Sequence, residues 1–230
     1  MILFDKKVRQ IRTVPIVSLF YPPTCGICGK VSSNFLCNKC KLLLDKEMVL
    51  GLESGLDSKF YFQEFLYLFS YQGIIRKMIL DYKFNDKSYL FRCIVNFLLN
   101  SEFLFEFLQS YDKIIPVPIS KKRYKERGYN QSALIAKGIQ RDMAIHLKYV
   151  DDCIFKVKDI IEQSKLNKEQ RQDNIKNVYV LNNNKISELQ NKKLLLVDDV
   201  FTTGSTVNEC CRILQKAKPE RIGVLVLAKD

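Results

Sequence analysis

The sequence predicts an α/β protein with a mainly parallel sheet flanked by helices, preceded by a small zinc-ribbon-like module. The C-terminal part of the chain reads strand, helix, strand in its apolar periodicity, and this alternation is typical of parallel sheets. Two Cys-x-x-Cys motifs near the N-terminus indicate the metal-binding module. With 230 residues, 47% of them hydrophobic, the chain can bury one good-sized core beside such a module.

Strands and helices are expected to alternate along the chain. The stretch 51–58 turns to Gly, Ser, Glu and Asp and predicts a loop, which separates residues 1–54, an N-terminal helix and the cysteine module, from a second domain at 55–230. Apolar and aromatic runs predict strands at 60–71, 113–118, 178–181, 194–197 and 222–227. Apolar spacings of three and four residues predict helices at 74–80, 89–108, 135–147 and 207–214, and a basic loop follows the strand at 113–118.

The formal net charge of +12 favours partners that bear phosphate, such as nucleotides, nucleic acid or anionic lipid. An AT-rich genome, which inflates Lys, Asn and Ile, would produce the same excess. The longest apolar run near the start, 14–20, is interrupted by Pro15 and Ser18, so we expect neither a membrane span nor a signal peptide. A cytoplasmic protein is expected, in which cysteines are metal ligands or reduced core residues. His146 has no acidic partner in a recognisable motif, which argues against a hydrolytic triad.

Four of the eight cysteines form two Cys-x-x-Cys motifs separated by eight residues. This spacing suits four thiolates around one tetrahedral zinc ion, with sulfur atoms about 2.3 Å from the metal. A redox motif would be expected as a single pair at a helix N-terminus. Because four protein ligands close the coordination shell, we expect a structural zinc ion. Its ligands are Cys25, Cys28, Cys37 and Cys40, while the remaining cysteines are scattered and expected in the core.

The segment 194–206 carries a second signal. Four apolar residues predict a buried strand, Asp198 and Asp199 follow at its carboxyl end, and a loop rich in hydroxyl groups opens a helix. Free backbone N–H groups and the helix dipole favour a phosphate at such a position, and glycine allows its close approach. The Gly-x4-Gly-Lys-Ser/Thr pattern of a P-loop is absent. The alternative is a purely structural segment, in which a strand is followed by an Asp-rich turn. The loop residues are Thr202, Thr203, Gly204, Ser205 and Thr206.

The segment 115–131 ends a predicted strand in prolines and then carries five cationic residues. A pyrophosphate group would bind well there, and Arg123 and Arg127 are expected to close over it and neutralise its charge. Two alternatives stay open. The cations could be a solvated loop, or they could form a groove for single-stranded DNA in which Tyr124 and Tyr129 stack on bases.

These segments resemble known proteins. Residues 194–206 resemble the phosphoribosyl pyrophosphate (PRPP) motif of type I phosphoribosyltransferases. The Pro-Val-Pro strand end, the basic run and the Arg-Gly-Tyr-Asn-Gln sequence within 115–131 resemble the ComF family of competence proteins. Gln163-x-x-Leu166 and Arg171-x-x-Asn174 look like two further ComF elements, and Asp81-Tyr-Lys83-Phe resembles a shorter one. The resemblance implies a type I phosphoribosyltransferase fold at 55–230.

The resemblance also implies roles for individual residues. Asp198 and Asp199 would accept hydrogen bonds from the ribose hydroxyls, and Mg²⁺ would be held mainly by oxygen atoms of PRPP. The loop after the proline-containing strand would grip pyrophosphate, often through a cis peptide, and by position involves Ile119, Ser120 and Lys121. Lys83 is expected to face the same pocket.

Two functions from different classes follow. A ComF-type competence protein would bind PRPP and support natural transformation by handling incoming single-stranded DNA at the cytoplasmic side of the inner membrane, as a peripheral protein with other competence proteins as partners. The alternative is an active PRPP-dependent phosphoribosyltransferase acting on an unidentified base or amine. Many proteins with this fold bind the ligand without turning it over, so the sequence leaves enzymatic activity open.

Overall fold

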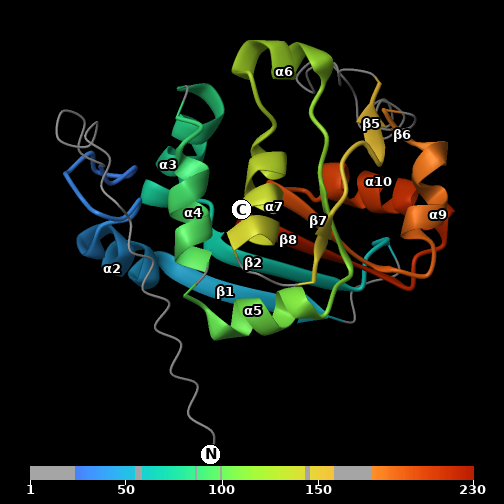
Figure 1. Cartoon of the computed structure of the whole chain (residues 1–230), viewed down its shortest axis with the longest axis horizontal. Helices are drawn as coiled ribbons and strands as arrows, with labels where there is room; N and C mark the ends of the chain where they lie inside the picture. Colours follow the sequence, from blue (N-terminus) through green and yellow to red (C-terminus); the bar gives the residue numbers. More distant parts are fainter. Residues whose placement is uncertain (1–23, 55–58, 86, 99, 143–145, 158–177) are drawn as a thin grey trace, which may run out of the picture.

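The computed structural model of the chain describes residues 24–54, 59–85, 87–98, 100–142, 146–157 and 178–230 (Figure 1). Its main sheet has six strands in the order β1-β2-β8-β7-β3-β4. Strands β2, β8, β7, β3 and β4 run parallel to their neighbours, while β1 is antiparallel to β2 at one edge. The strands are β1 (Met48–Ser54), β2 (Glu64–Ser70), β3 (Lys113–Pro116), β4 (Lys148–Tyr149), β7 (Lys193–Phe201) and β8 (Arg221–Lys229). The predicted α/β class with a mainly parallel sheet is confirmed.

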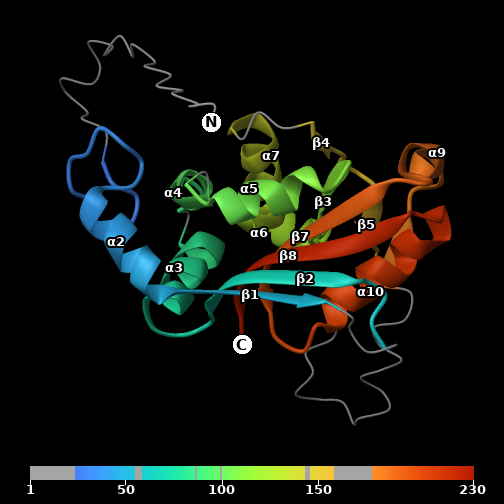
Figure 2. The same cartoon turned by 90° about the horizontal axis from the view of Figure 1, so that it is seen from below.

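Both faces of the sheet are covered, which explains why its central strands are apolar without alternation. Leu195 and Val197 of β7 pack into a core with helices on one face, while Leu194 and Leu196 pack into a second core on the other. Figure 2 shows these layers edge-on. The first face carries α3 (Gly73–Phe84), α4 (Leu90–Leu98), α5 (Glu102–Gln109) and α7 (Gln131–Asp142), and the second carries α10 (Ser205–Leu214) and α9 (Ile186–Leu189).

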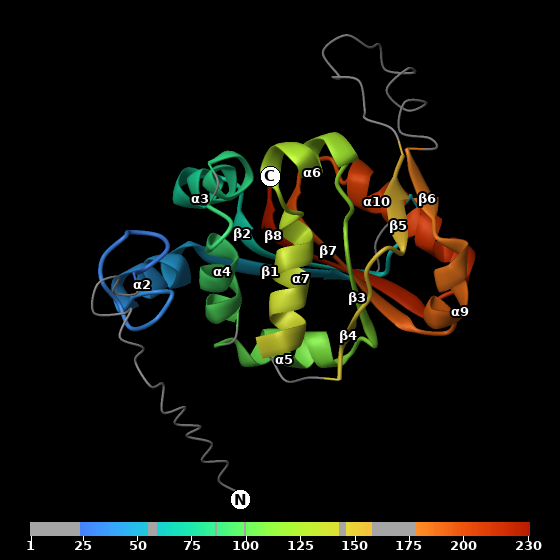
Figure 3. The ribbon, with the colours of Figure 1, turned by 45° about the horizontal axis from the view of Figure 1, so that its top comes forward.

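A small antiparallel sheet of β5 (Ile154–Lys156) and β6 (Tyr179–Leu181) packs on the second face beside α10. Short 3₁₀ turns flank α9 and follow α10, at η2 (Asn183–Lys185) and η3 (Gln215–Ala217). Helix α2 (Asn38–Glu47) lies at the opposite end of the main sheet from β5, β6 and α9 (Figure 3). The cysteine-rich segment before α2 is therefore at the far end of the molecule from the small sheet.

Several expected boundaries are wrong, and local hydrogen bonds explain two of them. The basic loop after β3 contains a helix, α6 (Lys121–Arg127), because the Ser120 hydroxyl accepts a hydrogen bond from Arg123 N at 3.3 Å and Gly128 ends the helix at φ 76°. The helix expected at 89–108 is two helices, because Ser101 caps α5 by accepting from Leu104 N.

The loop expected at 51–58 is also wrong in part, because residues 51–54 belong to β1 and pair with β2. The region 1–54 therefore contributes an edge strand to the main sheet. The helix expected at 135–147 begins earlier, and Leu147 lies beyond its end, next to β4. The scattered cysteines Cys93, Cys153, Cys210 and Cys211 are buried in the core as expected. Within the described residues, no helix has the length and apolar content that crossing a bilayer requires.

Candidate functional site

A crevice of about 380 Å³ opens where the loops after β3 and β7 diverge. After β3 the chain passes to β4 on one side of that strand, and later enters β7 on its other side. Such a switch point in an open parallel sheet is where ligands characteristically bind, beyond the carboxyl ends of the strands. We call this space the central crevice. Its polar lining includes Lys83, Arg123, Arg127, Gln131, Ser132, Asp198, Asp199, Thr202 and Thr206.

The floor of the central crevice carries the acid pair. The sequence predicted that the two aspartates follow the strand, but they lie within the last part of β7. Asp198 Oδ1 accepts hydrogen bonds from Ser132 Oγ at 3.0 Å and from Asp199 N at 2.9 Å. Asp199 is buried, and its Oδ1 lies 2.8 Å from Lys83 Nζ.

Burial and the neighbouring Asp199 raise the pKa of Asp198 to about 7. Near neutral pH the Asp198 carboxyl group therefore loses its proton reluctantly. A carboxyl group that keeps its proton can donate a hydrogen bond to a hydroxyl group as well as accept one. The arrangement suits a diol.

The hydroxyl-rich loop after β7 leads directly into α10. Gly204 adopts φ 72° as the residue before the helix, and a Cβ there would lie 2.3 Å from the ring of Phe201. Thr203 Oγ1 and Ser205 Oγ are 2.8 Å apart, while Thr202 and Thr206 line the crevice. Gly204 has no side chain that could cap the helix, and Ser205 N makes only a long hydrogen bond of 3.4 Å to Thr203 Oγ1, so an anion can accept from N–H groups of the first turn of α10.

Helix α6 supplies the basic wall. Arg123 and Arg127 are one helical turn apart and both line the central crevice. Burial and the proximity of Arg123 lower the pKa of Arg127, and its guanidinium lies 4.7 Å from the centre of the Phe84 ring. Two guanidinium groups that face the same space repel each other, and an anion between them would relieve that repulsion.

The predicted pyrophosphate loop is divided between two cavities. Ile119 lines the central crevice, whereas Ser120 and Lys121 line a separate groove on the other side of the loop. All peptide bonds among the described residues are trans, so the cis peptide expected at this loop is not observed.

The end of α3 closes the crevice from a third side, and sequence reasoning identified this wall only through the short element around Lys83. Tyr82 Oη donates a hydrogen bond to the Gln131 carbonyl oxygen at 2.9 Å, and the Tyr129 hydroxyl donates to the Tyr82 carbonyl oxygen. The Gln131 side chain is 1% exposed, and its Nε2 has no hydrogen-bond partner among the described residues. An unpaired buried donor at the wall of a crevice is unfavourable unless a ligand or water accepts from it. Sequence reasoning missed Gln131 and Ser132 as site residues because their chemistry depends on α3 and β7 packing against them.

The four N-terminal cysteines form a compact cluster. Their Sγ atoms all lie within 4.8 Å of one another, and Cys28 and Cys37 Sγ are 3.8 Å apart. A tetrahedron of sulfur atoms about 2.3 Å from zinc has edges of about 3.8 Å. Backbone bonds shape the first knuckle: Gly29 N donates to the Cys25 carbonyl at 2.8 Å, with Gly29 at φ 72°. The donor set and its spacing therefore fit a metal ion. The cluster comprises Cys25, Cys28, Cys37 and Cys40.

Two predicted motifs cannot be placed in this site. Gln163-x-x-Leu166 and Arg171-x-x-Asn174 lie outside the described residues. His146 is described and exposed.

Comparison with known proteins supplies independent findings. A phosphoribosyl transferase domain matches residues 131–230. Competence protein F of Haemophilus influenzae is 37% identical over 118 residues, which is 51% of this chain and 50% of that protein. DNA utilization protein YhgH of Escherichia coli K12 is 30% identical over 122 residues, 53% of this chain and 51% of that protein. The chain spans about half the length of these relatives.

Competence protein ComFC of Bacillus subtilis is 21% identical over 212 residues, which is 90% of this chain and 78% of that protein. The chain thus contains a phosphoribosyl transferase domain, and its resemblance to the ComF family is confirmed.

Proposed function

Because the chain contains a phosphoribosyl transferase domain and resembles ComF-type proteins, we propose that it binds PRPP with Mg²⁺ in the central crevice and supports natural transformation. One observation carries the first part. An acid pair on β7 and two arginines on α6 line the same crevice, although they come from distant parts of the chain. PRPP needs both, because it joins a ribose diol to two groups of negatively charged phosphate.

Each part of the ligand has a matching wall. The ribose hydroxyls would meet Asp198 and Asp199, and the 5′-phosphate would meet the loop 202–206 and the first turn of α10. The pyrophosphate would lie against Arg123 and Arg127. Mg²⁺, held mainly by oxygen atoms of PRPP, would neutralise part of the pyrophosphate charge.

Within the predicted pyrophosphate loop, Ile119 is the residue that reaches the crevice. Ser120 acts indirectly in this proposal, because its hydroxyl caps α6 and so orients Arg123. The Lys121 side chain lines the neighbouring groove and would add positive charge from a distance.

The second part of the proposal is the role of the protein in natural transformation. The relatives named for competence and for DNA utilization, together with the net charge of +12, support a role in handling incoming single-stranded DNA. We place this role in the cytoplasm, peripheral to the inner membrane, with other competence proteins as partners. In this proposal residues 1–54 hold a structural zinc ion through the four clustered cysteines, and residues 55–230 form the PRPP-binding domain.

Calorimetry on the zinc-loaded full chain tests PRPP binding. The ligands are PRPP with and without Mg²⁺, ribose 5-phosphate and inorganic pyrophosphate. Asp199→Ala is expected to weaken the binding of ribose 5-phosphate by about tenfold, and Arg127→Ala is expected to weaken the binding of pyrophosphate by about tenfold. Each loss corresponds to about one charged contact. Both variants should bind PRPP more weakly than the wild type, whereas Asp45→Ala on the exposed side of α2 should bind it equally well. Unchanged PRPP affinity in both crevice variants would contradict the proposal.

The alternative is an active phosphoribosyltransferase, and the position of two arginines supports it. Arg123 and Arg127 line the crevice together with the acid pair, where they could stabilise the negative charge that develops as pyrophosphate leaves C1′. This alternative predicts PRPP-dependent release of pyrophosphate with some base or amine, abolished by Asp198→Ala. Absence of release across a broad panel of acceptors, with PRPP binding intact, would count against it.

A further inference from the structure

A second cavity, which we call the outer groove, lies on the other side of the loop after β3. Its volume is about 850 Å³, and it shares only Pro118, Ile119 and Lys156 with the central crevice. Its walls are the start of α6, one face of α7, the connection from β4 to β5, and the outward face of β5 and β6. None of the ligand groups placed above lies in this space.

The outer groove combines exposed aromatic and apolar side chains with cations. Tyr124 of α6 is 54% exposed and Phe155 of β5 is 41% exposed, and Val157 and Val180 continue the apolar surface beside Phe155. Lys121 and Lys122 line the groove next to Tyr124, and neither forms an ion pair with any acid in the described ranges. Exposed rings beside unpaired cations are the chemistry that binds single-stranded nucleic acid, in which bases stack and phosphates pair with lysine.

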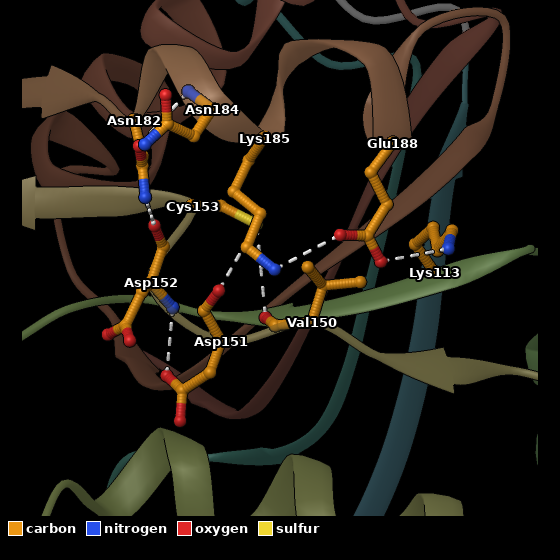
Figure 4. Close-up of polar contacts among 9 residues, drawn as sticks. All are labelled: Lys113, Val150, Asp151, Asp152, Cys153, Asn182, Asn184, Lys185 and Glu188. Carbon is orange, nitrogen blue, oxygen red and sulfur yellow. Dashed lines mark hydrogen bonds and ion pairs between the residues drawn. The ribbon is translucent and has the colours of Figure 1, made fainter.

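The floor of the outer groove is held in place by a polar network (Figure 4). Asp152 adopts φ 54°, and its N–H donates to Asp151 Oδ1 at 3.0 Å. Asn182 ties this turn to β6, because its N–H donates to the Cys153 carbonyl at 2.8 Å and its Nδ2 donates to the Asp152 carbonyl at 3.0 Å. Close by, Glu188 accepts from Lys113 and Lys185 at 3.2 and 3.1 Å.

This network has two consequences. The hydrogen bonds from Asn182 to the Cys153 and Asp152 carbonyl oxygens hold the wall that presents Phe155 in place, so little ordering opposes binding there. The exposed carboxylates of Asp151 and Asp152 repel phosphate from the floor, although Lys137 Nζ, 3.6 Å from Asp151 Oδ2, offsets part of the charge of Asp151. Phosphates are therefore favoured on the α6 side of the groove, and bases on the β5–β6 side.

We propose that the outer groove binds single-stranded DNA, with phosphates along Lys121 and Lys122 and bases against Tyr124 and Phe155. The proposal rests on the DNA-handling part of the proposed function and gives that part a location. Helix α6 serves both cavities: Arg123 and Arg127 line the central crevice, while Lys121, Lys122 and Tyr124 line the outer groove. PRPP and DNA can then be bound at the same time. A duplex is disfavoured, because its bases are already stacked.

Fluorescence anisotropy with a labelled oligothymidylate of about 20 nucleotides, at about 50 mM salt, tests the site on zinc-loaded full chain. Tyr124→Ala and Phe155→Ala are each expected to weaken binding by about 5-fold or more through lost stacking. The double variant Lys121→Ala/Lys122→Ala is expected to lower the salt dependence by up to about two phosphate contacts. Matched controls are Tyr61→Ala and Lys216→Ala, which change exposed residues outside the outer groove and are expected to bind like the wild type.

The outcomes separate this proposal from the function on which it rests. Weakened DNA binding in the groove variants, with PRPP affinity unchanged and no competition between PRPP and the oligonucleotide, supports the groove. Wild-type binding that the groove variants leave intact overturns the groove but not DNA handling. Competition by PRPP, with loss of DNA binding in Arg127→Ala, overturns the groove in favour of the central crevice. No binding by the wild type at low salt refutes DNA handling and the groove together.

Discussion

Replacing Asp198 by Asn is expected to stabilise the ligand-free protein at neutral pH while weakening the proposed binding of PRPP. Asp198 Oδ1 accepts both of the hydrogen bonds that the side chain receives, from Ser132 Oγ and Asp199 N, and an asparagine oxygen can accept the same two. The substitution therefore removes a charge without removing a bond. It also removes repulsion between two neighbouring carboxylates.

The magnitude follows from the pKa of Asp198, which burial and Asp199 raise from 3.8 to about 7. A difference of roughly three units corresponds to about 4 kcal/mol, and partial solvation in an open crevice reduces this to about 2–3 kcal/mol. The sign is clear: as pH rises from about 4 to 7, unfolded chains lose this proton while folded chains keep it, so the wild type becomes progressively less stable than the asparagine variant. Below about pH 4 both side chains are neutral and the difference disappears.

Urea unfolding of the wild type and Asp198→Asn across this pH range measures the effect. The difference in unfolding free energy should grow with pH and level off above about 7, with a Tm higher by about 5–10 °C there. Zinc release at low pH affects both proteins alike, and Asp45→Asn on α2 serves as an exposed control. A difference that stays constant with pH, or a variant that loses stability as pH rises, would refute the reasoning.

Two further predictions concern the phosphate loop and the metal cluster. Gly204→Ala is expected to destabilise the folded chain by about 1–3 kcal/mol and to weaken the proposed binding of PRPP, because the residue has φ 72° and a Cβ would collide with the Phe201 ring. Gly73→Ala should lose less unfolding free energy, because Gly73 has φ 51° but open space around an added Cβ. Urea unfolding of the two variants measures this difference. Cys28→Ser is expected to reduce bound zinc from about one ion per chain, measured by a colorimetric chelator, whereas Cys153→Ser in the core should not. Equal zinc content in both variants would contradict the assigned ligands.

Features that depend on short stretches of sequence were predictable. The four apolar residues 194–197 predicted a buried strand because a sheet covered on both faces selects an unbroken apolar run. The Cys-x-x-Cys spacing predicted the clustered sulfur atoms because each motif forms its own tight turn. Local hydrogen bonds were harder to anticipate: Ser120 and Gly128 turn a lysine- and arginine-rich segment into a helix, although their cap positions can be seen in the sequence.

Features that depend on packing between distant segments were decided by the tertiary structure. The ion pair between Lys83 and Asp199 exists because α3 ends over the carboxyl edge of β7. The raised pKa of Asp198 needs the burial that β7 acquires in the assembled sheet. The division of one basic segment between a crevice and a groove follows from where α6 lies relative to β5. By itself, the sequence determined which chemical groups the protein carries and the local turns that hold them, since those signals have short periods. Which groups face the same space was decided only by the fold, because contact between distant residues depends on how whole helices and strands pack.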